Sequence, residues 1–151
     1  MVHPMVARSP KGTKLFFNLD GAVGVKAPNH EADVQLVQFA YYAMSELREG
    51  SAAELAAFSR VQPGMFYAGT ETDPLTLAIR EHQRARGGTQ DGHVSVIPAG
   101  NTLLYDGMHS FMLVALNNNL RKLMPTDFPR IDKHTRCPAA LRSAIQQSMQ
   151  P

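Results

Sequence analysis

The chain has 151 residues, of which 44% are hydrophobic and 19% are charged, and its formal net charge is +2. This length fits one domain, and the composition argues against general disorder. No apolar run approaches the ~20 residues of a membrane span, and the basic residues are too scattered to favour a nucleic acid partner.

Residues 1–14 contain two prolines and a glycine among small and basic residues, which favours a loose arm. They lack the apolar core of a secretory signal, so we expect the protein to stay in the cytoplasm or to be exported without a cleaved signal. Residues 14–19 are rich in aromatic side chains and end at Asp20-Gly21, a pattern that predicts a short strand closed by a turn.

The first strong helix follows residues 28–29 and ends at Gly50. Asn29 is the expected N-cap, and Glu31 and Asp33 suit the positive end of the helix dipole. The apolar positions on one stripe are Val34, Val37, Tyr41 and Met44. Further apolar residues widen this stripe, so we expect a central helix that is buried on more than one side.

Residues 51–54 (SAAE) form a capping box, which predicts a short extra helix as far as about Val61. Pro63-Gly64 ends this helix, and the apolar residues 65–68 favour a short strand. Asp73 and Pro74 then fit the N-cap and first position of another helix. Its expected inward face consists of Leu75, Ala78, Ile79 and His82.

Gly87-Gly88 ends that helix, and Asp91-Gly92 is a turn before a β-branched strand at residues 94–97. Residues 98–107 resemble a loop, and a long helix is expected at 108–124. Its predicted core face is Met108, Phe111, Met112, Ala115, Leu116, Leu120 and Leu123. An amphipathic helix at 138–149, with Leu141, Ala144, Ile145 and Met149 together, docks either on the body of the protein or on a partner.

Three of these elements carry a shared signature. The first helix reads Val34-x-x-Val37-Gln38-x-x-Tyr41, and the second reads Ala78-Ile79-x-x-His82-Gln83, nine residues after Gly69. Asp91-Gly92-x-Val94 and a helix with Leu116-Asn117 follow. In this order they resemble the peptidoglycan-binding-domain-like family over residues 25–124.

The resemblance implies a mainly α protein. It has a compact three-helix core with short strands and hairpin turns, an extra helix in the insert and a C-terminal helix. Residues 1–24 are then an N-terminal arm with a short strand, and residues 125–151 are a tail.

The signature residues have different expected roles. Gln38 and Gln83 each follow a core-facing position, where an amide can hydrogen-bond a neighbouring turn, so we expect them to be structural. Gly69 and Asp91-Gly92 supply turns that need positive φ. The resemblance implies that a ligand contacts exposed loop residues near the second helix. These expected ligand-binding residues are Tyr67, Thr70, Glu71, Thr72 and Arg80.

No pattern predicts a metal site, a cofactor or catalysis. His82, His93 and His109 lie near Asp91 and Asp106 in the chain, but the spacings that make a zinc site specific are absent. The sequence also lacks nucleophile elbows and phosphate-binding loops. Cys137 has no catalytic signature around it, so we expect an ordinary surface or buried thiol.

Two functions remain open, and neither is enzymatic. The first is a binding module for peptidoglycan, working as part of a phage or a secretion apparatus. The second is a protein–protein adaptor that keeps the fold and has lost glycan binding. The altered turn Ala68-Gly69-x-x-Thr72 and the extra tail helix favour this second function. A small hydrolase with an unrecognised site is the least supported possibility.

Overall fold

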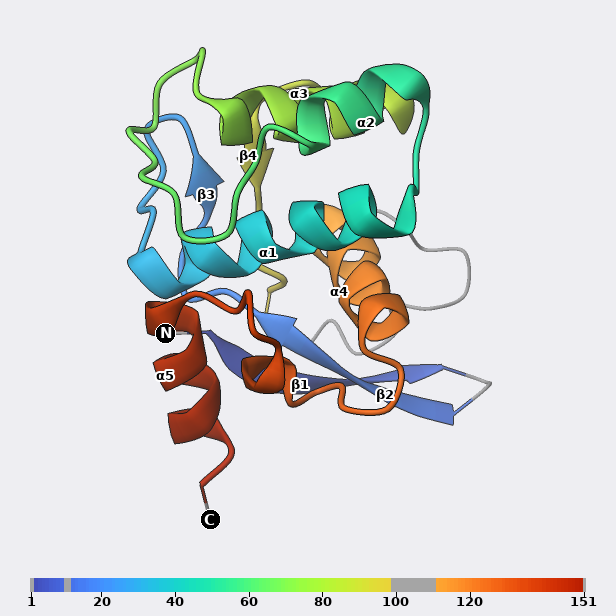
Figure 1. Cartoon of the computed structure of the whole chain (residues 1–151), viewed down its shortest axis with the longest axis vertical. Helices are drawn as coiled ribbons and strands as arrows, with labels where there is room; N and C mark the ends of the chain where they lie inside the picture. Colours follow the sequence, from blue (N-terminus) through green and yellow to red (C-terminus); the bar gives the residue numbers. More distant parts are fainter. Residues whose placement is uncertain (1, 10–11, 99–110, 151) are drawn as a thin grey trace.

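The computed structural model describes residues 2–9, 12–98 and 111–150. The chain is 47% helical, and the described part contains five α-helices and two small antiparallel sheets (Figure 1). The predicted mainly α class is therefore confirmed. None of the helices in the described ranges has the length and apolar character needed to cross a membrane.

The N-terminal segment is a β-hairpin. Strand β1 (His3–Ser9) pairs antiparallel with β2 (Gly12–Asn18), from the pair His3 and Asn18 to the pair Ser9 and Gly12. The expectation of a loose arm at residues 1–14 is wrong, because this segment supplies one whole strand. The predicted strand at 14–19 exists as β2 and begins earlier than expected. Its residues Phe16 and Phe17 are fully buried.

A second, very short sheet joins two distant loops. Strand β3 (Val23–Gly24) pairs antiparallel with β4 (His93–Val94). The strand expected at 94–97 is thus shorter and begins one residue earlier. This pairing brings the segment before the first helix next to the turn that follows the second signature helix.

Helix α1 (Glu31–Leu47) is the central element, as predicted, and contacts α2, α4 and α5 (Figure 1). Its N-cap is His30, which makes no side-chain capping bond, so the expected cap at Asn29 is wrong. Asn29 has φ 51° and instead accepts from Gly24 N (2.8 Å) and donates to Gly24 O (2.7 Å). The helix ends before Arg48, whose left-handed conformation (φ 55°) stops it ahead of Gly50.

Helix α2 (Ala52–Phe58) begins with the predicted capping box. Glu54 N donates to Ser51 Oγ (3.2 Å), and Ser51 N donates to Glu54 Oε1 (3.0 Å). The helix ends at Phe58, three residues before the expected Val61. Residues 65–68, expected as a strand, have no regular structure.

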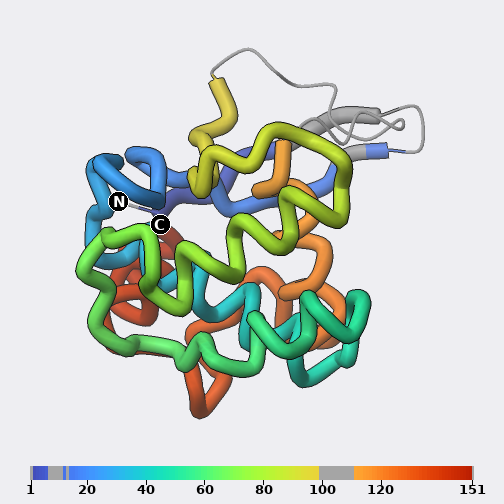
Figure 2. Tube along the Cα trace, turned by 90° about the horizontal axis from the view of Figure 1, so that it is seen from above, coloured from blue at the N-terminus to red at the C-terminus, as the bar shows by residue number. Residues whose placement is uncertain are grey.

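Helix α3 (Pro74–Ala85) packs along α2, as Figures 1 and 2 both show. Pro74 occupies the first turn as predicted. Asp73 is the N-cap residue, but its carboxylate makes no capping bond. It accepts instead from Thr70 N (2.8 Å) and Thr70 Oγ1 (2.9 Å).

Helix α4 (Met112–Leu123) buries Leu116 and Leu120 as predicted, but the centre of its buried side is shifted from the predicted face. Its buried residues are Leu113, Val114, Leu116, Asn117, Asn119 and Leu120. The expected core positions Phe111, Met112, Ala115 and Leu123 are only half-buried. The buried side is rotated because Asn117 bonds the hairpin, accepting from Phe17 N (2.7 Å) and donating to Phe17 O (3.0 Å). The predicted loop at 98–107 and the helix start at 108, with Met108, fall almost wholly outside the described residues.

A 3₁₀ turn, η1 (Ile131–Lys133), leads to α5 (Ala139–Ser148), which packs on α1 and β1. Leu141, Ala144 and Ile145 are buried there, and Leu141 N donates to Gln35 Oε1 of α1 (2.8 Å). The C-terminal helix therefore docks on the body of the protein. Its residues share one hydrophobic core with the hairpin and with α1.

Candidate functional site

Gln38 on α1 holds the loop that follows α2. Its amide donates to Met65 O (2.9 Å) and accepts from Gly64 N (3.0 Å), and its side chain is fully buried. Both polar atoms of one glutamine thus satisfy the backbone on either side of a turn. This arrangement, which we call the Gln38 clasp, was expected from the sequence.

Gln83 on α3 holds the turn at Asp91-Gly92 by hydrogen bonds of the same kind. Its amide nitrogen donates to Asp91 Oδ1 (2.7 Å) and His93 O (3.0 Å), and its oxygen accepts from Gly92 N (2.9 Å). Gly92 has φ +73°, and a Cβ there would lie 3.1 Å from Arg80 Nε. The positive φ favours glycine in this turn, whereas the contact with Arg80 involves only the end of a flexible side chain. We call this the Gln83 clasp.

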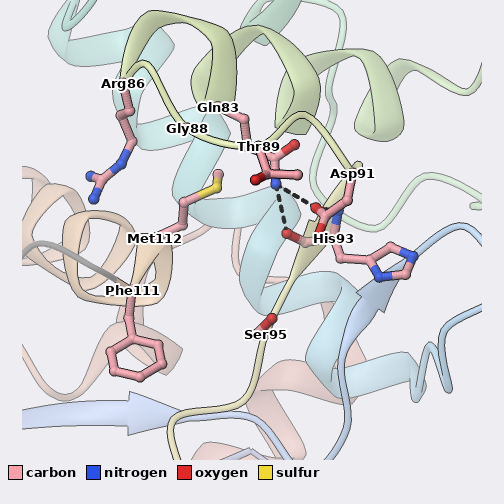
Figure 3. Close-up of a pocket in the computed structure, with 9 residues that line it drawn as sticks. All are labelled: Gln83, Arg86, Gly88, Thr89, Asp91, His93, Ser95, Phe111 and Met112. Carbon is pink, nitrogen blue, oxygen red and sulfur yellow. Dashed lines mark hydrogen bonds between the residues drawn. The ribbon is translucent and has the colours of Figure 1, made fainter.

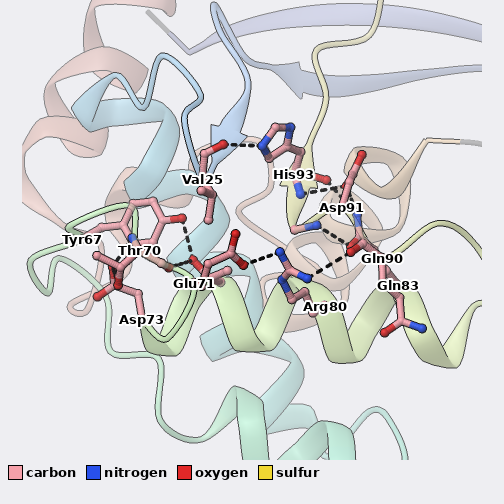
Figure 4. A network of polar contacts seen from close by, with 12 residues as sticks. Val25, Tyr67, Thr70, Glu71, Asp73, Arg80, Gln83, Gln90, Asp91 and His93 are labelled. Carbon is pink, nitrogen blue, oxygen red and sulfur yellow. Dashed lines mark hydrogen bonds and ion pairs between the residues drawn. The ribbon is translucent and has the colours of Figure 1, made fainter.

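The ligand-binding residues expected from the resemblance lie along one stretch, the turn before α3 and the helix itself (Figure 4). Tyr67 Oη lies 2.8 Å from Thr76 Oγ1, which donates to Thr70 O (2.7 Å). The hydroxyl of Thr76 has only one proton, so Tyr67 is the donor in this chain. Tyr67 is thus held in place, and its hydroxyl is already used within the protein.

Arg80 and Glu71 are also committed to each other. Arg80 Nη2 pairs with Glu71 Oε2, and Arg80 Nη1 donates to Gln90 O (3.3 Å). Thr72 is exposed. The five expected residues thus lie on the loop before α3 and on α3 itself; Glu71 and Arg80 bond each other, and Tyr67 and Thr70 bond Thr76 and Asp73.

A groove next to this loop contains a residue that the sequence analysis missed. Phe66 is 85% exposed, the largest exposure recorded for a large hydrophobic residue in the described part of the chain. It lines a cavity of about 420 Å³ with Tyr67, Asn29, Glu31 and Gln35 of the α1 end. We call this the Phe66 groove. The one available signal was the apolar stretch at residues 65–68. In an extended backbone successive side chains point to opposite sides, which would separate Phe66 from Tyr67.

A second cavity, of about 410 Å³, lies between the end of α3, β4 and the start of α4 (Figure 3). Its lining includes Arg86, Thr89, Asp91, Ser95, Phe111 and Met112. Asp91 Oδ1 accepts from Gln83 and from His93 N (2.9 Å). Although burial raises the pKa of this carboxyl, the hydrogen bonds outweigh burial and lower it overall. Asp91 therefore remains ionised across the neutral range.

A third cavity, of about 320 Å³, lies between α2 and α3. Its floor is made of small apolar side chains with Leu77, which is 39% exposed, and Arg60 and Arg80 lie at its edges. Arg80 therefore lines a different cavity from Tyr67. The expected ligand-binding residues do not form a single pocket.

Two further side chains with groups that could react, those of His82 and Cys137, are buried. Burial lowers the pKa of His82 to about 4 and raises the pKa of the Cys137 thiol to about 11. His82 is thus neutral and Cys137 is protonated at neutral pH. Among the described residues no three His, Cys, Asp or Glu side chains are grouped as a metal ion would need. His109 and Asp106 of the histidine-rich segment lie outside the described residues.

No known family model matches this chain, and no curated protein or solved structure is detectably similar to it.

Proposed function

We propose that this protein is a non-catalytic binding module of the peptidoglycan-binding-domain-like class, and that its ligand is the glycan and peptide polymer of the bacterial cell wall. The observation that carries the proposal is Phe66. A phenylalanine ring that is 85% exposed gains little for folding, since most of its apolar surface stays in water. A ring that is kept in this state on a fixed loop is suited to contact a ligand.

The loop around Phe66 is fixed on both sides. The Gln38 clasp holds Gly64 and Met65 immediately before it. Tyr67 immediately after it is bonded to Thr76 of α3. Because the backbone is already ordered, a ligand that covers the ring does not have to order it, and this preorganisation favours affinity.

The groove suits an amino-sugar and peptide polymer. The ring offers a flat apolar face, and the Glu31 carboxylate lines the same cavity. The amides of Asn29 and Gln35 also line it, but they already bond Gly24 and Leu141 within the protein. Cavities of this size, lined by an aromatic residue and a few polar groups, are typical ligand sites. The two glutamine clasps on α1 and α3 are the scaffold expected of the family, and they also support the proposal.

Retention on insoluble peptidoglycan sacculi tests the proposal. Wild-type protein should bind saturably, and Phe66→Ala should weaken binding about thirtyfold, the loss typical of a central aromatic contact. Because Phe66 is 85% exposed, the melting temperature of Phe66→Ala should stay close to that of wild type. Phe66→Ala tests ligand contact more specifically than Tyr67→Ala, because Tyr67→Ala would also break the hydrogen bond to Thr76.

Leu77→Ala is the matched control. Leu77 is also an exposed hydrophobic residue, but it lies in the cavity between α2 and α3. It should bind sacculi like wild type. Equal weakening in both variants, or no saturable binding by wild type, would refute the cell-wall proposal and favour a protein-binding adaptor instead.

A further inference from the structure

The cavity between α3, β4 and α4 brings opposite charges to one small space (Figure 3). The carboxylate of Asp91 lies on one side in this view, and the guanidinium of Arg86 lies on the other. Met112 lies between them, and Phe111 lies below. The Gly87-Gly88 turn folds the chain so that a residue at the end of α3 and one five positions later line the same pocket.

The acidic side of the pocket is built into the fold. Asp91 Oδ1 is held by Gln83 and by His93 N, so the carboxylate has a fixed orientation. Within the described residues, Oδ2 of the same carboxylate has no hydrogen-bond partner. A fixed and ionised carboxylate with one unused oxygen is a good acceptor for an ammonium group.

The basic side carries a permanent charge. Arg86 lines the cavity, and its charge contributes to the lowered pKa of the buried His82. An arginine can bind a carboxylate through two parallel hydrogen bonds. The hydroxyls of Thr89 and Ser95, both on exposed residues, add neutral donors and acceptors to the lining.

The apolar part of the lining separates the two charges. Phe111 and Met112 are half-buried and present carbon and sulfur atoms to the cavity. Methionine adapts its shape to aliphatic groups. A purely anionic ligand would meet Asp91, and a purely cationic one would meet Arg86, so the lining selects against both.

We propose that this pocket binds a small zwitterion, whose ammonium group pairs with Asp91 and whose carboxylate pairs with Arg86, with a short aliphatic chain lying on Met112 and Phe111. An ω-amino acid, or a C-terminal lysine with its ε-ammonium group and its terminal carboxylate, has this chemistry. The site is separate from the Phe66 groove, so it does not depend on the cell-wall proposal.

Isothermal titration of the full chain with three compounds of nearly equal length tests the site. ε-Aminocaproate carries both charges, caproate lacks the ammonium group, and n-pentylamine lacks the carboxylate. We expect saturable binding of ε-aminocaproate, and binding about tenfold weaker for each single-charge compound, the loss of one charge-assisted hydrogen bond. Equal affinity for the three compounds, or no saturable heat with ε-aminocaproate, would overturn the proposal.

Variants then locate the site. Asp91→Asn keeps an oxygen for Gln83 and His93 while removing the charge, and Arg86→Gln removes the opposite charge. Each should weaken ε-aminocaproate binding about tenfold without preventing folding, which the melting temperature checks. Arg84→Gln is the control, because Arg84 is exposed and pairs with Glu81 outside the cavity. Unchanged affinity in both site variants would refute the assignment.

Sacculi retention of these variants separates the two proposals. Phe66→Ala should bind sacculi more weakly and should bind ε-aminocaproate like wild type. Asp91→Asn and Arg86→Gln should bind ε-aminocaproate more weakly, whatever their binding to sacculi. Loss of ε-aminocaproate binding in Phe66→Ala would contradict the separation of the two sites.

Discussion

His82 and Tyr41 form a polar pair inside the hydrophobic core. The Tyr41 hydroxyl lies 3.1 Å from His82 Nδ1, and Phe58 packs near both rings. Burial raises the pKa of Tyr41 well above its ordinary value, so the hydroxyl keeps its proton. It therefore donates to Nδ1, and the neutral imidazole carries its proton on Nε2. The pair satisfies two groups that would each be costly to bury alone.

This pair predicts a loss of stability in acid. The folded pKa of His82 is about 4, below the ordinary 6.5, so the unfolded chain binds a proton first as the pH falls. Stability from His82 is therefore complete above about pH 6.5 and is lost progressively towards pH 4. The loss is on the order of 3 kcal/mol. Urea denaturation at several pH values measures it.

The variant His82→Phe isolates this contribution. It removes the titrating group and leaves the Tyr41 hydroxyl without its partner, so it should be less stable at neutral pH by about 1–3 kcal/mol. Its stability should also fall less than wild type between pH 6.5 and 4. An equally steep fall in the variant would show that other groups cause the acid sensitivity.

At the scale of elements, the two glutamine clasps connect helices to turns. Gln38 extends from α1 to the loop after α2, and Gln83 extends from α3 to the turn before β4. Each amide satisfies backbone groups that a helix or sheet would otherwise satisfy. Each of these loops is thereby tied to a helix by side-chain hydrogen bonds.

Gln38→Leu should loosen the loop that carries Phe66. The variant leaves Gly64 N and Met65 O without their partner, so the free energy of unfolding should fall by about 2 kcal/mol. Amide hydrogen exchange at Gly64 should accelerate by more than the global destabilisation explains. Gln147→Leu, on an exposed position of α5, should change neither quantity. Unchanged exchange at Gly64 would contradict the role of the clasp.

Local patterns in the sequence predicted the elements that local chemistry decides. The Ser51 capping box and Pro74 at a helix start act within one helical turn, and the two glutamines were recognised from their place beside core-facing helix positions. Where a neighbouring backbone group competes for a capping side chain, the predicted caps failed. Asn29 looks like a cap, but its amide bonds Gly24, and Asp73 bonds Thr70 for a similar reason.

The candidate site was less predictable than the fold. Tyr67 and Thr70 were correctly placed near the second signature helix, but their bonds to Thr76 and Asp73 could not be read from spacing. Phe66 was missed because a phenylalanine in an apolar stretch looks like core. Its exposure follows from the path of the loop, which the Gln38 clasp sets from another helix.

At the scale of the whole molecule, one core unites the hairpin, the central helices and α5. The buried set includes Phe16 and Phe17 of β2, Leu36 of α1 and Ile145 of α5. Helix α5 packs on α1 and on β1, and α4 packs on α1 and on β2, so both ends of the described chain join this core. The tail is part of the folded body.

Removing the tail should therefore unfold the protein. A chain that ends after Met124 loses the buried Ile131, Leu141 and Ile145, and we expect it to lack a cooperative thermal transition. The milder Leu141→Ala should cost about 2–5 kcal/mol, whereas Ser143→Ala, on an exposed position of the same helix, should cost little. A truncated chain that is folded and monomeric would contradict this expectation.

The clamp of Asn117 on Phe17 has a consequence for synthesis of the protein. The two residues are 100 positions apart, and chains elongate at roughly 5–20 residues per second, so the clamp is delayed by about 5–20 s. During that time β2 carries Phe16 and Phe17 with nothing to cover them from α4. The nascent hairpin therefore exposes two large apolar side chains until α4 has been made and the core can close.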